Sequence, residues 1–233
     1  FDGEDFNNDI INLGFWPGGD RDGNPFVTTE ITLSTARKLR SDVIKNYYRD
    51  IRKLRRRLTF KNIDTIVVNI ENRLYKSIFN DDNPPEISLE ELKSKLYQIK
   101  EILTNEHKSL FIDDLDDLIN KVNIFGYHFA SLDIRQDSRI HSKVFENIFK
   151  IAQKSLIKIF PTNYLNLSEE KKIKVLSNIK RNIPLDHFKD ELAISTLGSI
   201  RAMKTIQNAN GEKGSNRYII SNNQSSLNIL EVF

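Results

Sequence analysis

The sequence contains no cysteine, so neither a disulfide framework nor a thiolate metal site can exist in it. That absence favours an intracellular protein. Long apolar runs are lacking too, because no stretch approaches the roughly 20 apolar residues that a membrane-spanning helix needs. An excess of one charge is also absent, since 35 Lys and Arg residues face 32 Asp and Glu residues. We therefore expect neither a membrane nor a nucleic acid as a partner.

The chain has 233 residues, of which 39% are hydrophobic, and this is enough to bury a sizeable core. No linker, low-complexity tract or internal repeat divides it, so we expect residues 1–233 to form a single fragment without a separate domain boundary. It begins with FDGEDFNND, which has neither an initiator Met nor the layout of a secretory signal. We expect a piece of a longer protein.

Helical periodicity covers most of the chain. Apolar residues recur every three or four positions between Ala36 and Leu58, and Thr29 could cap the start of this helix. Ser88 and Glu91 have capping-box spacing ahead of a second helix through Leu103. Further helices are expected at residues 115–122 (ending at Gly126), 139–155 (capped by Ser138), 168–181 (capped by Ser168) and 187–209.

Three short stretches rich in aromatic or β-branched residues predict strands, namely Asn12–Trp16, Tyr127–Ile134 and Arg217–Ser221. Each is followed by a loop and then by a helical pattern. Asn208–Ser215 is expected to be a surface loop. The order of elements predicts an α/β fold, predominantly helical, with parallel strands whose carboxyl ends carry the functional groups.

The segment GGDRDGNP, Gly18–Pro25, follows the first expected strand. Its glycines let the backbone approach a ligand closely, and Arg21 between Asp20 and Asp22 could be held in one rotamer with its fork pointing outward. Such an arrangement suits bidentate recognition of a phosphate or a carboxylate. An ordinary turn with Asp-Gly and Asn-Pro punctuation explains the composition equally well.

A second polar cluster, LDIRQDSRIH, ends the second expected strand at Leu132–His141. Asp133 and Arg135 project to the same face of an extended strand, so they could pair beside a ligand. A purely structural ion pair is the alternative. The basic stretch Arg49–Arg57 flanks an apolar stripe without interleaved aromatics, which favours a solvated helix face. His107, His128 and His187 are isolated and lack metal-ligand spacing.

Three motifs in the same order resemble the phosphoenolpyruvate carboxylase family. GFWPGGDRDGNPFVT (Gly14–Thr28) resembles its most specific motif, LDIRQDS (Leu132–Ser138) its second signature, and RYIIS (Arg217–Ser221) its third. The chain departs from the family pattern at Pro17, where a bulky apolar residue is more common, and at Asn222 and Asn223, where Met-Ala is common. These departures leave the charged residues of the first motif untouched.

The resemblance implies that a longer parent enzyme converts phosphoenolpyruvate and bicarbonate to oxaloacetate and phosphate with Mg²⁺ or Mn²⁺. It implies a cytoplasmic homotetramer and a (β/α)8 barrel, of which this chain would hold about three strands with long helical insertions. Arg21 matches the family's phosphate-binding Arg and is our predicted catalytic and substrate-binding residue. We predict Arg135 and Gln136, in the second motif, as further substrate-binding residues.

The family's metal ligands, catalytic His and glycine-rich loop have no counterpart that we find in this chain. We therefore expect no metal site in it and no carboxylase activity from it alone. A different class stays open at this point: a non-catalytic helical scaffold, or a nucleic-acid-binding module, that merely retains the motifs.

Overall fold

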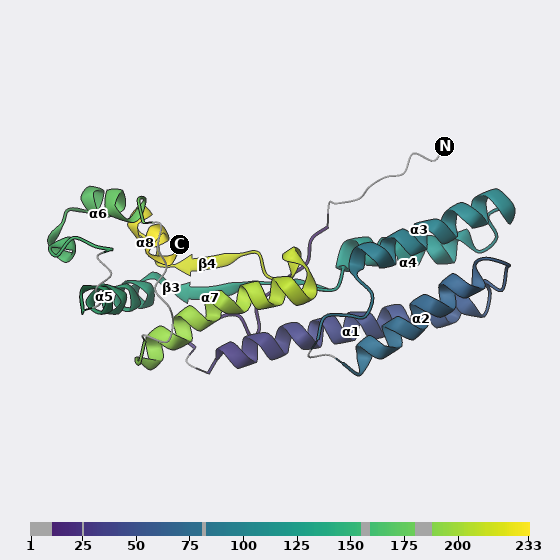
Figure 1. The fold of residues 1–233 in the computed structure, drawn as a ribbon, viewed down its shortest axis with the longest axis horizontal. Coiled ribbons are helices and arrows are strands. Elements are labelled where there is room, and N and C mark those ends of the chain that lie inside the picture. The colour runs from purple at the N-terminus through teal and green to yellow at the C-terminus, as the bar shows by residue number, and fades with distance from the viewer. Residues whose placement is uncertain (1–10, 25, 81–82, 155–158, 180–187) are drawn as a thin grey trace. The chain divides into compact units, whose positions relative to one another are not determined.

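The computed structural model describes residues 11–24, 26–80, 83–154, 159–179 and 188–233. Pro25, His187 and the expected helix ends at 155, 181 and 187 lie outside the described residues. The chain is predominantly helical, with a few short parallel strands, as predicted from the sequence (Figure 1). The finer prediction, that these strands belong to a partial barrel, is not confirmed. No helix in the described ranges combines the length and the apolar character needed to cross a membrane.

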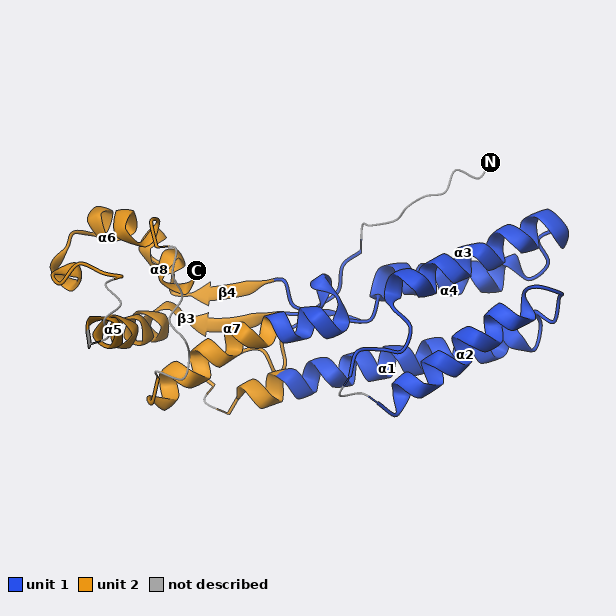
Figure 2. Cartoon of the chain, viewed as in Figure 1, with its two compact units in different colours: residues 1–15, 33–132, 204–216 blue, residues 16–32, 133–203, 217–233 orange. Residues whose placement is uncertain are grey.

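The chain falls into two compact units, which are coloured separately in Figure 2. Unit 1 comprises residues 1–15, 33–132 and 204–216, and unit 2 comprises residues 16–32, 133–203 and 217–233. The helices α1 (Thr29–Arg55) and α7 (Glu191–Asn210) contribute residues to both units. Because the units are interleaved in the sequence, the expectation of one fragment without a boundary along the chain stays a prediction.

Unit 1 is built on helices packed around one apolar core. Besides most of α1 it contains α2 (Asp64–Ile78), α3 (Leu89–Glu106) and α4 (Ile112–Phe125). The core includes residues from all four helices, for example Ile51, Ile70, Ile99 and Leu118, each at most 1% exposed. The apolar stripe expected along α1 is therefore the buried one. The helix itself ends at Arg55, so that Leu58 lies beyond it, although Leu58 is buried.

The strands of unit 1 are very short. β1 (Gly14–Phe15) pairs in parallel with β2 (Ser131–Leu132). The expected strand at Tyr127–Ile134 is wrong in its first half, because Tyr127 and His128 form a turn after α4. Tyr127 is buried there as a core residue, and its hydroxyl donates to the carbonyl of Ile87 at 2.9 Å. Aromatic character marked burial here rather than a strand.

The surface loop expected at Asn208–Ser215 is also wrong. The helix α7 continues to Asn210, and a 3₁₀ helix, η3, follows at Glu212–Gly214. The side chain of Asn210 makes two hydrogen bonds. Its Nδ2 donates to the carbonyl of Ala36 at 2.9 Å, and its Oδ1 accepts from Arg40 Nη1 at 3.2 Å. The polar composition of this segment thus provides hydrogen bonds inside unit 1, and both Asn210 and Ser215 are buried.

Unit 2 contains the second pair of strands and the remaining helices. β3 (Ile134–Asp137) pairs in parallel with β4 (Tyr218–Ser221). The helices are α5 (Ser138–Lys154), α6 (Glu169–Leu176), α8 (Ser226–Val232), the first part of α7 and the 3₁₀ helix η1 (Tyr164–Asn166). Phe145 and Phe149 of α5 pack with Phe160 and Tyr164 in an aromatic cluster.

Candidate functional site

The loop that contains GGDRDGNP is shaped by backbone hydrogen bonds. The amides of Gly19 and Asp20 both donate to the carbonyl of Trp16, at 2.8 and 3.0 Å. Gly18 has a φ of +84°, which a residue without a Cβ adopts at little cost. The Thr32 hydroxyl at the start of α1 donates to the carbonyl of Gly18 at 2.6 Å. This set of contacts fixes the path of the chain just before Arg21.

The loop then pairs with β3, so the first and second motifs meet as expected. Asp20 forms an isolated parallel bridge with Arg135. The Arg135 amide donates to the carbonyl of Gly19 at 2.9 Å, and the Arg21 amide donates to the carbonyl of Arg135 at 3.0 Å. The residues around Arg21 are therefore held by backbone bonds to a strand rather than by a free turn.

The side chain of Arg21 is nine-tenths buried. Its partners are not Asp20 or Asp22, as the sequence suggested, but Ser195 of α7. Its Nη1 donates to the Ser195 carbonyl at 3.0 Å and its Nη2 donates to the Ser195 hydroxyl. Its Nε is buried and has no hydrogen-bond partner among the described atoms. Burial lowers the pKa of Arg21, but a guanidinium stays charged at any ordinary pH.

The side chains of Arg21 and Arg135 leave on different faces of the paired strands. Side chains alternate along an extended chain, and Asp20 is the residue that lies opposite Arg135. Arg21 therefore shares its face with Gln136. Gln136 is buried, and its Oε1 accepts from the amide of Asp137 at 3.1 Å. The structure thus brings two of the three predicted site residues to one face and separates the side chain of the third.

Arg135 instead belongs to an ionic cluster with Asp133. The carboxylate of Asp133 accepts from Arg135 Nη2 at 3.3 Å and from Arg217 Nε at 2.7 Å. The Arg135 guanidinium also lies 5.6 Å from the centre of the Trp16 ring. Asp133 precedes β3 and Arg217 precedes β4, so their ion pair sits at the amino ends of these strands. Ligands of parallel sheets bind at the carboxyl ends, which favours the structural interpretation of this pair.

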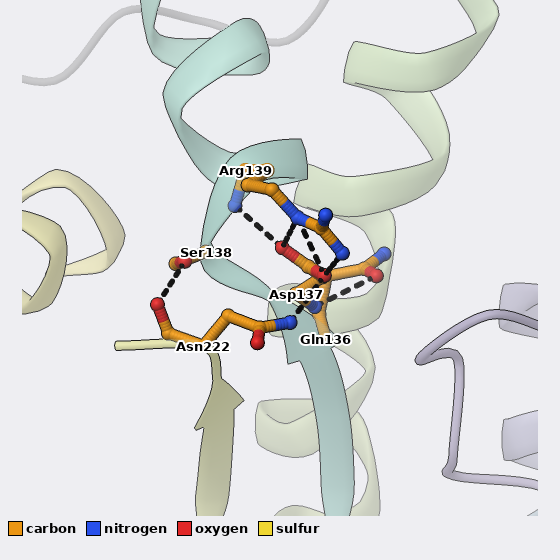
Figure 3. A network of polar contacts seen from close by, with 5 residues as sticks. All are labelled: Gln136, Asp137, Ser138, Arg139 and Asn222. Atoms are coloured by element: carbon orange, nitrogen blue, oxygen red, sulfur yellow. Dashed lines mark hydrogen bonds and ion pairs between the residues drawn. The ribbon is translucent and has the colours of Figure 1, made fainter. Parts of the chain in front are cut away.

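A second polar network lies at the carboxyl ends of β3 and β4 (Figure 3). The buried carboxylate of Asp137 accepts from the Arg139 amide at 2.7 Å, from Arg139 Nε at 2.9 and 3.0 Å, and from Arg139 Nη2. It also accepts from the Asn222 side chain at 2.8 Å. The Arg139 side chain, and then Asn222, hold the pKa of Asp137 well below its usual range.

This network corrects one expectation about α5. Ser138 was expected to cap the helix, but it is the first helical residue, and Asp137 accepts the Arg139 amide instead. The Ser138 hydroxyl donates to the carbonyl of Asn222 at 2.8 Å. Asn222 has a φ of +51°, which Asn tolerates better than most residues. The end of β4 is therefore tied to the start of α5 through both the backbone and the side chain of Asn222.

His141 and Tyr218 form a hydrogen-bonded pair near Arg21. The His141 Nε2 and the Tyr218 hydroxyl are 2.9 Å apart. Burial, assisted by the charge of Arg21, lowers the pKa of His141 to about 4. Burial raises the pKa of Tyr218 to about 12. Both groups are thus neutral at pH 7, and neither offers a negative charge to Arg21.

The described residues do not fit a divalent cation. They include no group of three or more His, Asp or Glu side chains that could hold a metal ion. Asp20, the acid next to Arg21, has an oxygen that accepts from the amide of Asp22 at 3.3 Å. Hard cations such as Mg²⁺ need several oxygen ligands in a fixed geometry. No chemical step can therefore be assigned to a metal on the described part of this chain.

Comparison with known proteins decides the family. The family model described as phosphoenolpyruvate carboxylase matches residues 3–88 and 67–233. The chain belongs to the phosphoenolpyruvate carboxylase family. A relative named phosphoenolpyruvate carboxylase, from Nitrosomonas eutropha, is 26% identical over an alignment of 266 residues that covers 95% of this chain. The chain spans only 28% of the length of that relative.

Each of the three phosphoenolpyruvate carboxylase motifs provides one polar side chain to the same face of unit 2. The first provides Arg21, the second Gln136 and the third Tyr218, which lies opposite Ile134 in the register of β3 and β4. Ser195 lies outside all three motifs, 174 positions from Arg21, and no spacing in the sequence pointed to it. The sequence marked Asn222 only as a departure from the family pattern and not as a hydrogen-bond partner of Asp137.

Proposed function

We propose that the protein carrying this chain is a phosphoenolpyruvate carboxylase, which converts phosphoenolpyruvate and bicarbonate to oxaloacetate and phosphate. In this proposal Arg21 binds the phosphate group of the substrate and stabilises its charge as it moves to bicarbonate. Membership of the family supports the reaction. The observation that supports this role is that the buried Arg21 guanidinium is held at both Nη atoms, while its Nε has no hydrogen-bond partner among the described residues.

A buried, unpaired donor is costly in a folded protein, because it has lost its hydrogen bonds to water. Such an atom at a conformationally fixed guanidinium is suited to an incoming oxygen ligand. Arginine binds phosphate with two parallel hydrogen bonds, and a charge-assisted contact of this kind is stronger than a neutral one. Gln136 lies on the same face and is proposed as a second substrate-binding residue. The role of Arg135 in substrate binding stays a prediction.

The remaining parts of the proposal rest on the family alone. The divalent cation, Mg²⁺ or Mn²⁺, would be held by other segments of the full-length protein. We also propose a cytoplasmic homotetramer that has neither a nucleic acid nor a membrane as a partner. In the structure the basic residues between Arg49 and Arg57 are solvent-exposed, with acidic neighbours such as Glu71 and Asp114 paired to them. No observation favours the nucleic-acid alternative over this one.

The experiment is Arg21→Lys in the full-length protein. Lysine keeps the charge but replaces a planar fork by a single flexible ammonium. Loss of one charge-assisted contact is worth about 1.5 to 3 kcal/mol, so kcat/KM for phosphoenolpyruvate should fall roughly 10- to 150-fold. Arg56→Lys, at an exposed position directly after α1, is the matched control and should leave the kinetics unchanged.

Thermal melting of the same preparations separates the two roles of Arg21. If Arg21 only ties the loop to α7, Arg21→Lys lowers the melting temperature and leaves kcat/KM of the folded enzyme near normal. That result would contradict the proposed phosphate-binding role.

A further inference from the structure

Ser195 lies outside the three family motifs and contacts the Arg21 guanidinium through two hydrogen bonds. It lies in the first part of α7 and is half-buried. Its backbone carbonyl accepts from Nη1 at 3.0 Å, and its side-chain hydroxyl accepts from Nη2. One residue thus supplies two acceptors, side by side, to the two terminal nitrogens of Arg21.

This arrangement leaves one edge of the guanidinium for a ligand. A guanidinium is planar and has five N–H donors in a fixed geometry. Ser195 occupies the edge between Nη1 and Nη2. The neighbouring edge, formed by Nε and the second N–H of Nη2, can donate two parallel hydrogen bonds. Its Nε is buried without a partner among the described atoms, which is the state expected of a donor kept for an acceptor that is not part of this chain.

The titratable groups that interact with the charge of Arg21 are compatible with a bound anion. His141 and Tyr218 are the titratable neighbours whose charge is coupled to that of Arg21, and both are neutral at pH 7. Asp137, the acid that acts on His141, is itself paired with Arg139. Among the described residues Arg21 donates to Ser195 and to no carboxylate, so its charge is available to a phosphate.

We propose that Ser195 is a positioning residue for substrate binding: by holding the Nη1–Nη2 edge of Arg21, it presents the Nε–Nη2 edge to the substrate phosphate. The inference rests on the proposed function of Arg21 and goes beyond it. It assigns a role to a residue on α7 that none of the three motifs contains, and it specifies which edge of the guanidinium meets the phosphate.

The test is Ser195→Ala in the full-length protein, with phosphoenolpyruvate as the varied substrate. Alanine keeps the carbonyl acceptor of Nη1 and removes the hydroxyl acceptor of Nη2, so the guanidinium loses one of its two fixed partners. We expect kcat/KM to fall about three- to tenfold, mainly through a higher KM. Ser195→Thr keeps a hydroxyl at this position and should restore most of the loss.

Thr196→Val is the matched control. Thr196 is the next residue of α7, is fully buried, and its hydroxyl has no hydrogen-bond partner among the described atoms. Valine has the same shape, so this change tests for a general disturbance of α7 and should leave kcat/KM unchanged. If Ser195→Ala does not accumulate as folded protein, Ser195→Cys, of similar size but with a weak acceptor, should show the same rise in KM.

Several outcomes would overturn the inference. Unchanged kinetics for Ser195→Ala with a lower melting temperature would show a purely structural role. Equal losses for Ser195→Ala and Thr196→Val would point to α7 rather than to the hydroxyl.

A double variant separates this inference from the proposed function. In an Arg21→Lys background, Ser195→Ala should add little, because lysine has no fork to orient. If Arg21→Lys itself leaves kcat/KM unchanged, the proposed phosphate-binding role of Arg21 fails. If Arg21→Lys is impaired and Ser195→Ala is not, only the role of Ser195 fails.

Discussion

At the scale of single residues, Gly19 shows how closely the first motif approaches β3. A Cβ placed on Gly19 would lie 2.1 Å from the carbonyl oxygen of Asp133. That oxygen belongs to the backbone, which cannot turn away as a flexible side chain can. A glycine is therefore required by this close backbone contact. The same contact fixes the register in which the loop pairs with β3, with Asp20 opposite Arg135.

We predict that Gly19→Ala destabilises the full-length protein by about 2 to 4 kcal/mol or prevents its folding, because β3 or the loop must move. Gly23→Ala is the control. Gly23 has a positive φ of +66°, which Gly19 does not, and nothing lies within 4 Å of its added Cβ. Its cost should be only the strain of the left-handed conformation, about 1 kcal/mol. Melting temperatures of both variants measure the difference, and equal shifts would contradict the steric explanation.

The candidate site was predictable from the sequence only in part. Arg21 was identified because its glycine-rich surroundings are unusual, and the Asp133–Arg135 pair followed from the alternation of a strand. The side-chain partners predicted for Arg21 were wrong. Asp20 and Asp22 are its neighbours in the sequence, whereas Ser195 is its neighbour in space. Local spacing carries no information about a contact across 174 positions.

At the scale of elements, the start of α3 was predicted from a local chemical signal. Ser88 has extended backbone angles, and its hydroxyl accepts from the amide of Glu91 at 3.1 Å. For α1, Thr28 performs this function rather than the expected Thr29, since its hydroxyl accepts from the amide of Ile31 at 3.3 Å. Ser168 precedes α6 with similar backbone angles, but its side chain makes no capping hydrogen bond.

We predict that Ser88→Ala costs about 1 kcal/mol, the usual value for an N-cap, whereas Ser168→Ala stays within about 0.5 kcal/mol. The two positions are matched, because each precedes a first turn with two glutamates. Chemical denaturation gives the global effect, and hydrogen exchange of the Glu91 amide gives the local one. Faster exchange at α6 in Ser168→Ala than at α3 in Ser88→Ala would be the opposite of this expectation.

The elements that were missed lacked such a signal or had an ambiguous one. α2 begins after Ile63, which makes no side-chain capping bond, and its first turns are rich in β-branched residues. Only tertiary packing, through Val67, Ile70 and Leu74, accounts for its burial. The segment after Asn208 was misread for the reverse reason. Its polar residues suggest a solvated loop, but the Asn210 side chain hydrogen-bonds to the carbonyl of Ala36 and to the buried Arg40. These partners come close to Asn210 only in the folded unit.

At the scale of the whole molecule, the chain is a part of the length over which its family is defined. Its helical content and short parallel strands were predictable because periodicity and strand composition are local properties. A closed barrel needs strands beyond the pairs β1–β2 and β3–β4, and the described residues form no further strand. The curated relative from Nitrosomonas eutropha is covered over only 28% of its length.

The same consideration leads to a prediction about activity. This chain alone should convert no phosphoenolpyruvate and bicarbonate to oxaloacetate, with either Mg²⁺ or Mn²⁺ present. Charge stabilisation of a moving phosphoryl group requires several positioned cations together, and the described residues provide Arg21 without a site for a divalent ion.

Oxaloacetate formation is followed through malate dehydrogenase, with the full-length protein as the positive control. Circular dichroism establishes that the chain is helical under the assay conditions, so that inactivity is not due to unfolding. Oxaloacetate production by the folded chain above a control without protein would show that this chain suffices for the reaction, and would remove the reason for placing the metal on other segments.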